Sequence, residues 1–182
     1  MNSAVAVFLA EIGDKTMLST ALFAINTRKS TLILAISVLA FLVANAICVV
    51  VGEVIREHID LELLQVVAAI MLITTGFWIT LSSESVSLVY TSKFNLLACF
   101  TTILLMEIGD KTQLAVFSLA LIHSKPYCLL AGGALGYLVA NTIGVLVAKS
   151  TSSRVEWRVV RRVAGVIMII LGALVVINAV LF

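Results

Sequence analysis

The sequence Glu-Ile-Gly-Asp-Lys-Thr occurs twice in this chain, at residues 11–16 and again at residues 107–112. The same shift of 96 residues places Leu-Val-Ala-Asn, at 42–45, onto an identical stretch at 138–141, and it places Gly76 onto Gly172. Three matches in one register, with identical polar residues, indicate that the chain arose by internal duplication.

The chain around these motifs is strongly apolar. Of its 182 residues, 62% are hydrophobic and 12% are charged, and there is one proline. Soluble domains of this size do not have such a composition, whereas a helix needs about 20 apolar residues to cross a bilayer. Hydropathy predicts six such helices, at residues 4–25, 32–55, 63–81, 94–122, 127–148 and 163–182. No room is left for a separate soluble domain, and the net charge of +2 does not indicate nucleic-acid binding.

The duplication and the six segments together predict the architecture. Residues 1–93 and residues 94–182 each contain three crossings, so the second half must enter the membrane in the opposite orientation. We therefore expect an all-α integral membrane fold with six transmembrane helices, arranged as two inverted three-helix repeats in one membrane domain.

The charge of the connecting segments predicts the orientation in the membrane. Eight basic residues lie in the first, third and fifth connections, whereas the opposite side has only Arg56 and Lys125. The eight are Arg28, Lys29, Lys93, Lys149, Arg154, Arg158, Arg161 and Arg162. The positive-inside rule places them in the cytoplasm and both termini outside.

Each motif falls near the middle of its predicted helix, at the depth where ionisable groups cost most. Glutamate and aspartate three residues apart share one helix face, and inversion brings the two faces together. We therefore predict that four acids converge on one site that suits a hard divalent cation such as Mg²⁺, Ca²⁺ or Mn²⁺. These acids are Glu11, Asp14, Glu107 and Asp110. Additional oxygen ligands are expected from Asn45, Asn141, Thr16 and Thr112.

The motif lysines suggest how the site exchanges ions. Lys15 and Lys111 each follow their motif glutamate by four residues, so each lysine pairs with that glutamate in a continuous helix. Four carboxylates and two lysines sum to about −2 when all are ionised. One divalent cation or two protons would neutralise this charge, so we expect metal and protons to occupy the carboxylates alternately. The count does not fix the number of protons.

Other residues receive simpler interpretations. The three cysteines lie inside apolar runs without metal-binding spacing, and they are interpreted as small packing residues. Gly132, Gly133, Gly136 and Tyr137 are interpreted as helix-packing residues rather than as chemical groups. The motif glycines allow close helix approach or local unwinding that frees backbone carbonyls.

The doubled Glu-x-Gly-Asp-Lys-Thr motif, in a chain of two three-helix halves, resembles the GDT family of cation/proton exchangers. That family includes Golgi-type manganese and calcium transporters and bacterial manganese exporters. The resemblance covers essentially the whole chain and implies antiport, with the four motif acids binding the metal. The short chain implies a bacterial inner-membrane protein that exports Mn²⁺ and needs no cofactor. One departure from symmetry is that Met17 aligns with Gln113, whose amide oxygen is a harder ligand, so the half-sites need not bind equally.

Alternatives of other classes remain open at this point. An exporter of a cationic amino acid would need an amide-lined or aromatic cleft rather than dense carboxylates. A non-transporting scaffold or channel subunit would need a continuous polar pore in the channel case, and the polar groups are concentrated at the midplane instead. An intramembrane enzyme is disfavoured because the residues flanking the aspartates supply no further catalytic group. The sequence ranks neither Mn²⁺ above Ca²⁺ nor one oligomeric state above another.

Overall fold

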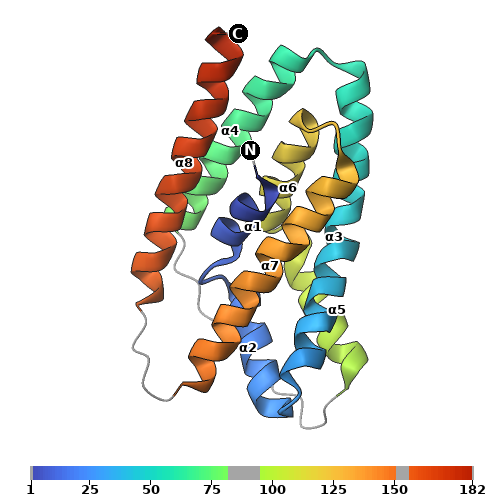
Figure 1. Ribbon diagram of the computed structural model, residues 1–182, viewed down its shortest axis with the longest axis vertical. Coiled ribbons are helices and arrows are strands. Elements are labelled where there is room, and N and C mark those ends of the chain that lie inside the picture. The colour runs from blue at the N-terminus through green and yellow to red at the C-terminus, as the bar shows by residue number, and fades with distance from the viewer. Residues whose placement is uncertain (1, 82–94, 151–155, 182) are drawn as a thin grey trace.

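The computed structural model describes residues 2–81, 95–150 and 156–181, and every regular element in these ranges is a helix (Figure 1). Eight helices occur there: α1 Ser3–Glu11, α2 Lys15–Thr27, α3 Ser30–His58, α4 Leu61–Leu81, α5 Leu96–Glu107, α6 Lys111–Ile122, α7 Pro126–Lys149 and α8 Trp157–Leu181. The predicted boundary between the halves, at residues 93 and 94, lies outside the described residues. The basic residues Lys93 and Arg154 lie outside them as well.

Two of the six predicted segments are not single helices. The first segment consists of α1 and α2, and the fourth consists of α5 and α6, with the interruption inside the repeated motif in both cases. Four other helices, α3, α4, α7 and α8, are long and apolar enough to cross a membrane. The helices therefore lie where the six apolar segments were predicted. The prediction of one unbroken helix at 4–25 and another at 94–122 is wrong.

The helix boundaries repeat with the register found in the sequence. Four boundaries in the first half recur 96 residues later in the second half. The last residue of α1 is equivalent to the last residue of α5. The first residues of α2, α3 and α4 are equivalent to the first residues of α6, α7 and α8, respectively. Figure 1 shows that corresponding helices run in opposite directions: α1 and α2 descend from the amino terminus, whereas α5 lies at the bottom and α6 above it.

Helices α4 and α8 form a closely packed pair at one side of the molecule (Figure 1). A Cβ placed on Gly76 would lie 2.7 Å from the carbonyl oxygen of Gly165, and one placed on Gly172 would lie 3.0 Å from that of Ala69. Because Gly165 and Gly172 are the repeat equivalents of Ala69 and Gly76, the two contacts are the same contact made twice. Small residues at such positions let helix backbones approach closely, as is typical of helices in membranes.

Large apolar side chains cover the outer surface of the long helices. Leu39 and Ile47 on α3, Leu135 and Leu146 on α7, and Leu81 on α4 are each more than half exposed. A water-facing surface rarely presents so many large apolar groups, whereas lipid accepts them. Apart from Arg161 on α8, the buried charged side chains belong instead to the two repeated motifs, where the site is found.

Candidate functional site

Each repeated motif folds as a tight turn between two helices. Ile12 has φ −65° and ψ 123°, Gly13 has φ 74°, and the Asp14 amide donates to the Glu11 carbonyl at 2.9 Å. This is the geometry of a type II β-turn, whose third residue needs a positive φ and therefore favours glycine. The second motif repeats it, with φ 78° at Gly109 and a 3.3 Å hydrogen bond from Asp110 to Glu107.

The residue four positions after each glycine caps its turn. The Gly13 amide donates to the Met17 sulfur at 3.4 Å, and the Gly109 amide donates to the Gln113 amide oxygen at 2.8 Å. Gln113 also donates to the Ala44 carbonyl at 2.9 Å. Both ends of the Gln113 amide therefore bond backbone groups, which gives Gln113 a structural role in addition to the ligand role predicted from its oxygen.

Four helix ends and four carboxylates meet at the two turns. Glu11 and Glu107 are the last residues of α1 and α5, and Asp14 and Asp110 precede α2 and α6 as their N-caps. All four side chains are buried, with at most 2% of their surface exposed. The carboxyl end of a helix carries partial negative charge, so the two glutamates lie where an additional positive charge is most strongly favoured.

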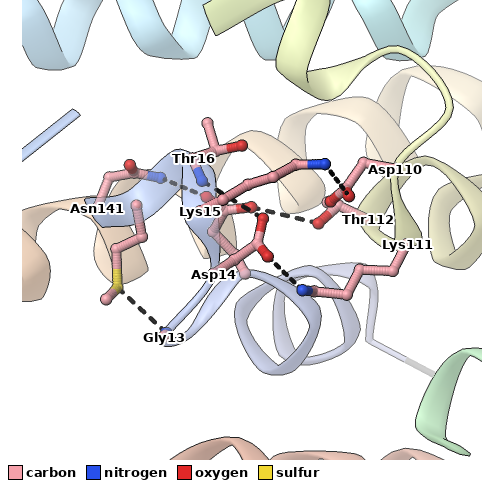
Figure 2. A network of polar contacts seen from close by, with 10 residues as sticks. Gly13, Asp14, Lys15, Thr16, Asp110, Lys111, Thr112 and Asn141 are labelled. Atoms are coloured by element: carbon pink, nitrogen blue, oxygen red, sulfur yellow. Dashed lines mark hydrogen bonds and ion pairs between the residues drawn. The ribbon is translucent and has the colours of Figure 1, made fainter. Parts of the chain in front are cut away.

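Ion pairs connect the two motifs crosswise, as Figure 2 shows. The Lys15 ammonium lies 3.0 Å from an oxygen of Asp110, and the Lys111 ammonium pairs with Asp14. The sequence predicted a different pairing, between each lysine and the glutamate four residues before it. That prediction assumed a continuous helix, and the turn removes the i, i+4 relation because glutamate and lysine stand in different helices.

Glu11 receives hydrogen bonds from the second half of the chain, from Thr112 and Asn141, which are labelled in Figure 2. The Thr112 hydroxyl donates to one carboxylate oxygen at 3.2 Å, and the Asn141 amide donates to the other at 3.3 Å. Asn141 and Thr112 thus lie at the predicted site. Thr16 lies there as well, since its backbone amide donates to Asp14 at 3.5 Å.

Several buried oxygen atoms of the site lack a hydrogen-bond partner. They are both carboxylate oxygens of Glu107, one of Asp110, the amide oxygen of Asn141 and the Thr16 hydroxyl. The amide oxygen of Asn45, which was also predicted as a ligand, is buried and unpartnered, and the Asn45 amide donates to the Phe41 carbonyl of its own helix. Unpartnered buried oxygens are costly and are the groups with which a hard cation is coordinated. The donor set therefore fits a divalent cation by its chemistry.

Two of the four acids are paired with lysines in this structure. Across residues 2–81, 95–150 and 156–181, no three His, Cys, Asp or Glu side chains are gathered closely enough to hold a metal ion. Each aspartate instead has a lysine ammonium on it. Binding of a cation by all four acids would therefore require the lysines to withdraw and the carboxylates to draw together.

One residue beside the acids was not predicted as part of the site. Tyr137 on α7 is fully buried and its hydroxyl adjoins the Glu107 carboxylate. The sequence interpretation treated Tyr137 as a packing residue because it follows Gly136 in a run of small residues. Its repeat equivalent is Phe41. The hydroxyl that Tyr137 has and Phe41 lacks was the feature of the sequence that could have indicated a polar role for Tyr137.

Comparison with known proteins agrees with the duplicated architecture. The family model described as "Divalent cation/proton antiporter GDT1" matches residues 1–87 and again residues 95–181. A protein of Vibrio cholerae serotype O1, named "Putative manganese exporter", is 30% identical over 176 residues, which cover 93% of this chain and 86% of that relative. No solved structure matches the chain.

Proposed function

This chain belongs to the divalent cation/proton antiporter GDT1 family, and we propose that it exports Mn²⁺ in exchange for protons through the site of Glu11, Asp14, Glu107 and Asp110. Members of this family are transporters, and their substrates are divalent cations. The observation that carries the proposal is the meeting of four buried carboxylates at two helix breaks in opposed halves.

The proposed arrangement has six crossings in two inverted halves. At about 1.5 Å per residue, the 9 residues of α1 and 13 of α2 together span about 33 Å, and α5 with α6 span a similar length. Each broken pair is therefore long enough to cross a hydrocarbon core of about 30 Å. Broken helices near the bilayer midplane are the usual place for a transported ion, because their ends supply partial charges and free backbone groups.

Manganese is the proposed substrate because two lines of support agree. The site offers carboxylate, amide and hydroxyl oxygens, which suit Mn²⁺ and also Ca²⁺. The relative from Vibrio cholerae carries manganese in its name. Neither line excludes Ca²⁺ as a second substrate, and a competition series between the two cations separates them.

Charge balance gives the exchange its physical basis. Four carboxylates and two lysines carry about −2 in the fully ionised state, and the crosswise pairs already neutralise both aspartates. An arriving divalent cation competes with these lysines and with protons for the same oxygens. When the cation is released, protons and the lysines bind the carboxylates again. The flux of the cation is thereby coupled to the flux of protons without any covalent step.

The proton gradient makes the proposed direction one of export. Under the positive-inside rule the connections after α2, α4 and α7 face the cytoplasm and both termini face outside. In a bacterial inner membrane this places the chain where an inward proton gradient drives Mn²⁺ out of the cell.

Flux in reconstituted vesicles tests the proposal. Mn²⁺ uptake is followed with an internal metal-sensitive dye while a second dye reports internal pH. We expect Mn²⁺-dependent proton movement that Glu11→Gln or Asp110→Asn abolishes and that Glu62→Gln leaves unchanged, because Glu62 is an exposed carboxylate at the start of α4. Lysine flux without metal, or Mn²⁺ flux that survives both site substitutions, would overturn the proposal.

A further inference from the structure

The two halves of the site differ at one pair of aromatic residues. Phe41 on α3 and Tyr137 on α7 occupy the same position in the two repeats, 96 residues apart. Both are fully buried, and their rings pack against each other with centroids 4.7 Å apart and planes inclined by 31°. The pair is close to symmetric except for one hydroxyl group, which belongs to Tyr137.

This hydroxyl lies beside the glutamate that has the fewest partners. The Tyr137 and Thr16 hydroxyls both adjoin the Glu107 carboxylate, yet the two hydroxyls and both carboxylate oxygens lack a hydrogen-bond partner of ordinary geometry. Glu11, in contrast, already receives hydrogen bonds from Thr112 and Asn141. A donor and an acceptor left unpaired side by side need only a small side-chain adjustment to meet.

Helix α7 carries a polar side chain beside each of the two glutamates. Asn141 and Tyr137 are four residues apart on α7, so they lie on one helix face, and Asn141 also donates to the Tyr137 carbonyl at 3.0 Å. The equivalent Asn45 on α3 makes the same hydrogen bond, to the carbonyl of Phe41, but the side chain of Phe41 has no hydroxyl. The symmetry of the site is therefore broken by α7.

We propose that Tyr137 is a positioning residue of the cation site, whose hydroxyl donates to Glu107 and orients that carboxylate toward the transported cation. The inference rests on the proposed function. With one carboxylate oxygen held by the phenol, the other is directed to the metal, and Glu107 is preorganised in the way that Asn141 and Thr112 preorganise Glu11. Tyr137 also makes the half-sites unequal. A threonine lies beside each glutamate, Thr16 beside Glu107 and Thr112 beside Glu11, whereas the further partner is a phenol for Glu107 and the Asn141 amide for Glu11.

The test removes the hydroxyl and keeps the ring. Tyr137→Phe leaves the aromatic pair in place, so transport kinetics report the hydroxyl alone. A hydrogen bond to a charged group is worth enough to change binding by about tenfold, so we expect the KM for Mn²⁺ to rise by about that factor. Because the hydroxyl acts on the bound ion rather than on the moving helices, the maximal rate should stay within about twofold.

A swap variant separates positioning from packing. Phe41→Tyr combined with Tyr137→Phe keeps the ring pair and the hydroxyl count, but it removes the hydroxyl from Glu107. We expect this variant to keep the raised KM of Tyr137→Phe, and the melting temperature without metal to be the same for wild type and Tyr137→Phe.

The possible results distinguish the two proposals. An unchanged KM in Tyr137→Phe, a KM restored by the swap, or a fall in maximal rate that tracks a lower melting temperature would overturn the role of Tyr137 while leaving Mn²⁺ transport intact. A wild-type protein that moves no divalent cation would overturn the proposed function, and this inference with it.

Discussion

The two motif lysines have the same sequence context but different surroundings. Lys111 is 1% exposed and Lys15 is 36% exposed, although both pair with an aspartate of the opposite motif. The difference arises because α4 packs against α6, which begins with Lys111. Identical residues in identical motifs therefore carry unequal energetic weight.

Neutralising each lysine should measure this inequality. Lys111→Met removes the ammonium group that pairs with the buried Asp14 carboxylate, which costs on the order of 3–5 kcal/mol of stability. Lys15→Met should cost clearly less, because solvent reaches that pair and screens it. Thermal unfolding in detergent, without metal, compares the two. The double variant Lys111→Met with Asp14→Asn should recover most of the loss, and equal losses for the two single variants would contradict the structure.

At this scale the sequence predicted which residues gather but not how they pair. The structure brings Glu11, Asp14, Glu107 and Asp110 to one buried region, and their role as metal ligands remains a prediction. The crosswise lysine pairs and the hydroxyl of Tyr137 could not be derived, because they depend on contacts between residues about 100 positions apart. A repeat in the sequence shows which residues of the two halves are equivalent. Which residues contact each other depends on how the two halves pack together.

At the scale of the helices, the decisive feature is the turn that divides two of them. The sequence analysis allowed local unwinding at the motif glycines, yet its predicted segments ran through them because hydropathy does not detect a break of three residues. The signal was present in Gly13 and Gly109, followed by an aspartate that is a favoured N-cap residue. An N-cap signature in the middle of an apolar segment predicts a broken helix better than hydropathy does.

Gly109 provides a direct test of the turn. A Cβ added to Gly109 meets no atom within 4 Å, so Gly109→Ala introduces backbone strain without a clash. At a φ of 78° this strain should lower the unfolding free energy by about 1–2 kcal/mol. Gly109→Asn should cost less, because asparagine tolerates the left-handed region better. Unfolding in mixed micelles measures both, and a stable alanine variant would contradict the turn geometry.

Over the whole molecule, the two halves are alike in fold but not in contacts. Helix α6 packs against α4, whereas the equivalent helices α2 and α8 have at most a marginal contact among the described residues. Leu121 of α6 is 2% exposed and clusters with Leu64 of α4, but its repeat equivalent Ile25 is 37% exposed. The α4–α8 pair therefore covers α6, whereas Lys15 at the start of α2 stays more exposed than Lys111 at the start of α6.

This asymmetry predicts the alternative conformation of a transporter with inverted repeats. Two opposite-facing states of such a fold can arise when the halves exchange conformations. In the exchanged state α8 would cover α2, Lys15 would be buried, and Lys111 would be exposed.

Paired cysteines can detect the exchange in a chain whose native Cys48, Cys99 and Cys128 are replaced by alanine. Leu64→Cys with Leu121→Cys should cross-link in the observed state, and the repeat-equivalent pair, Ile25→Cys with Val160→Cys, should cross-link only in the exchanged one. Because transport requires both states, either cross-link should stop Mn²⁺ flux, and reduction should restore it. Changing Mn²⁺ or pH on one side of the vesicle should shift cross-linking from one pair to the other. Active transport with no cross-link at the second pair under any of these conditions would show that the halves do not exchange conformations.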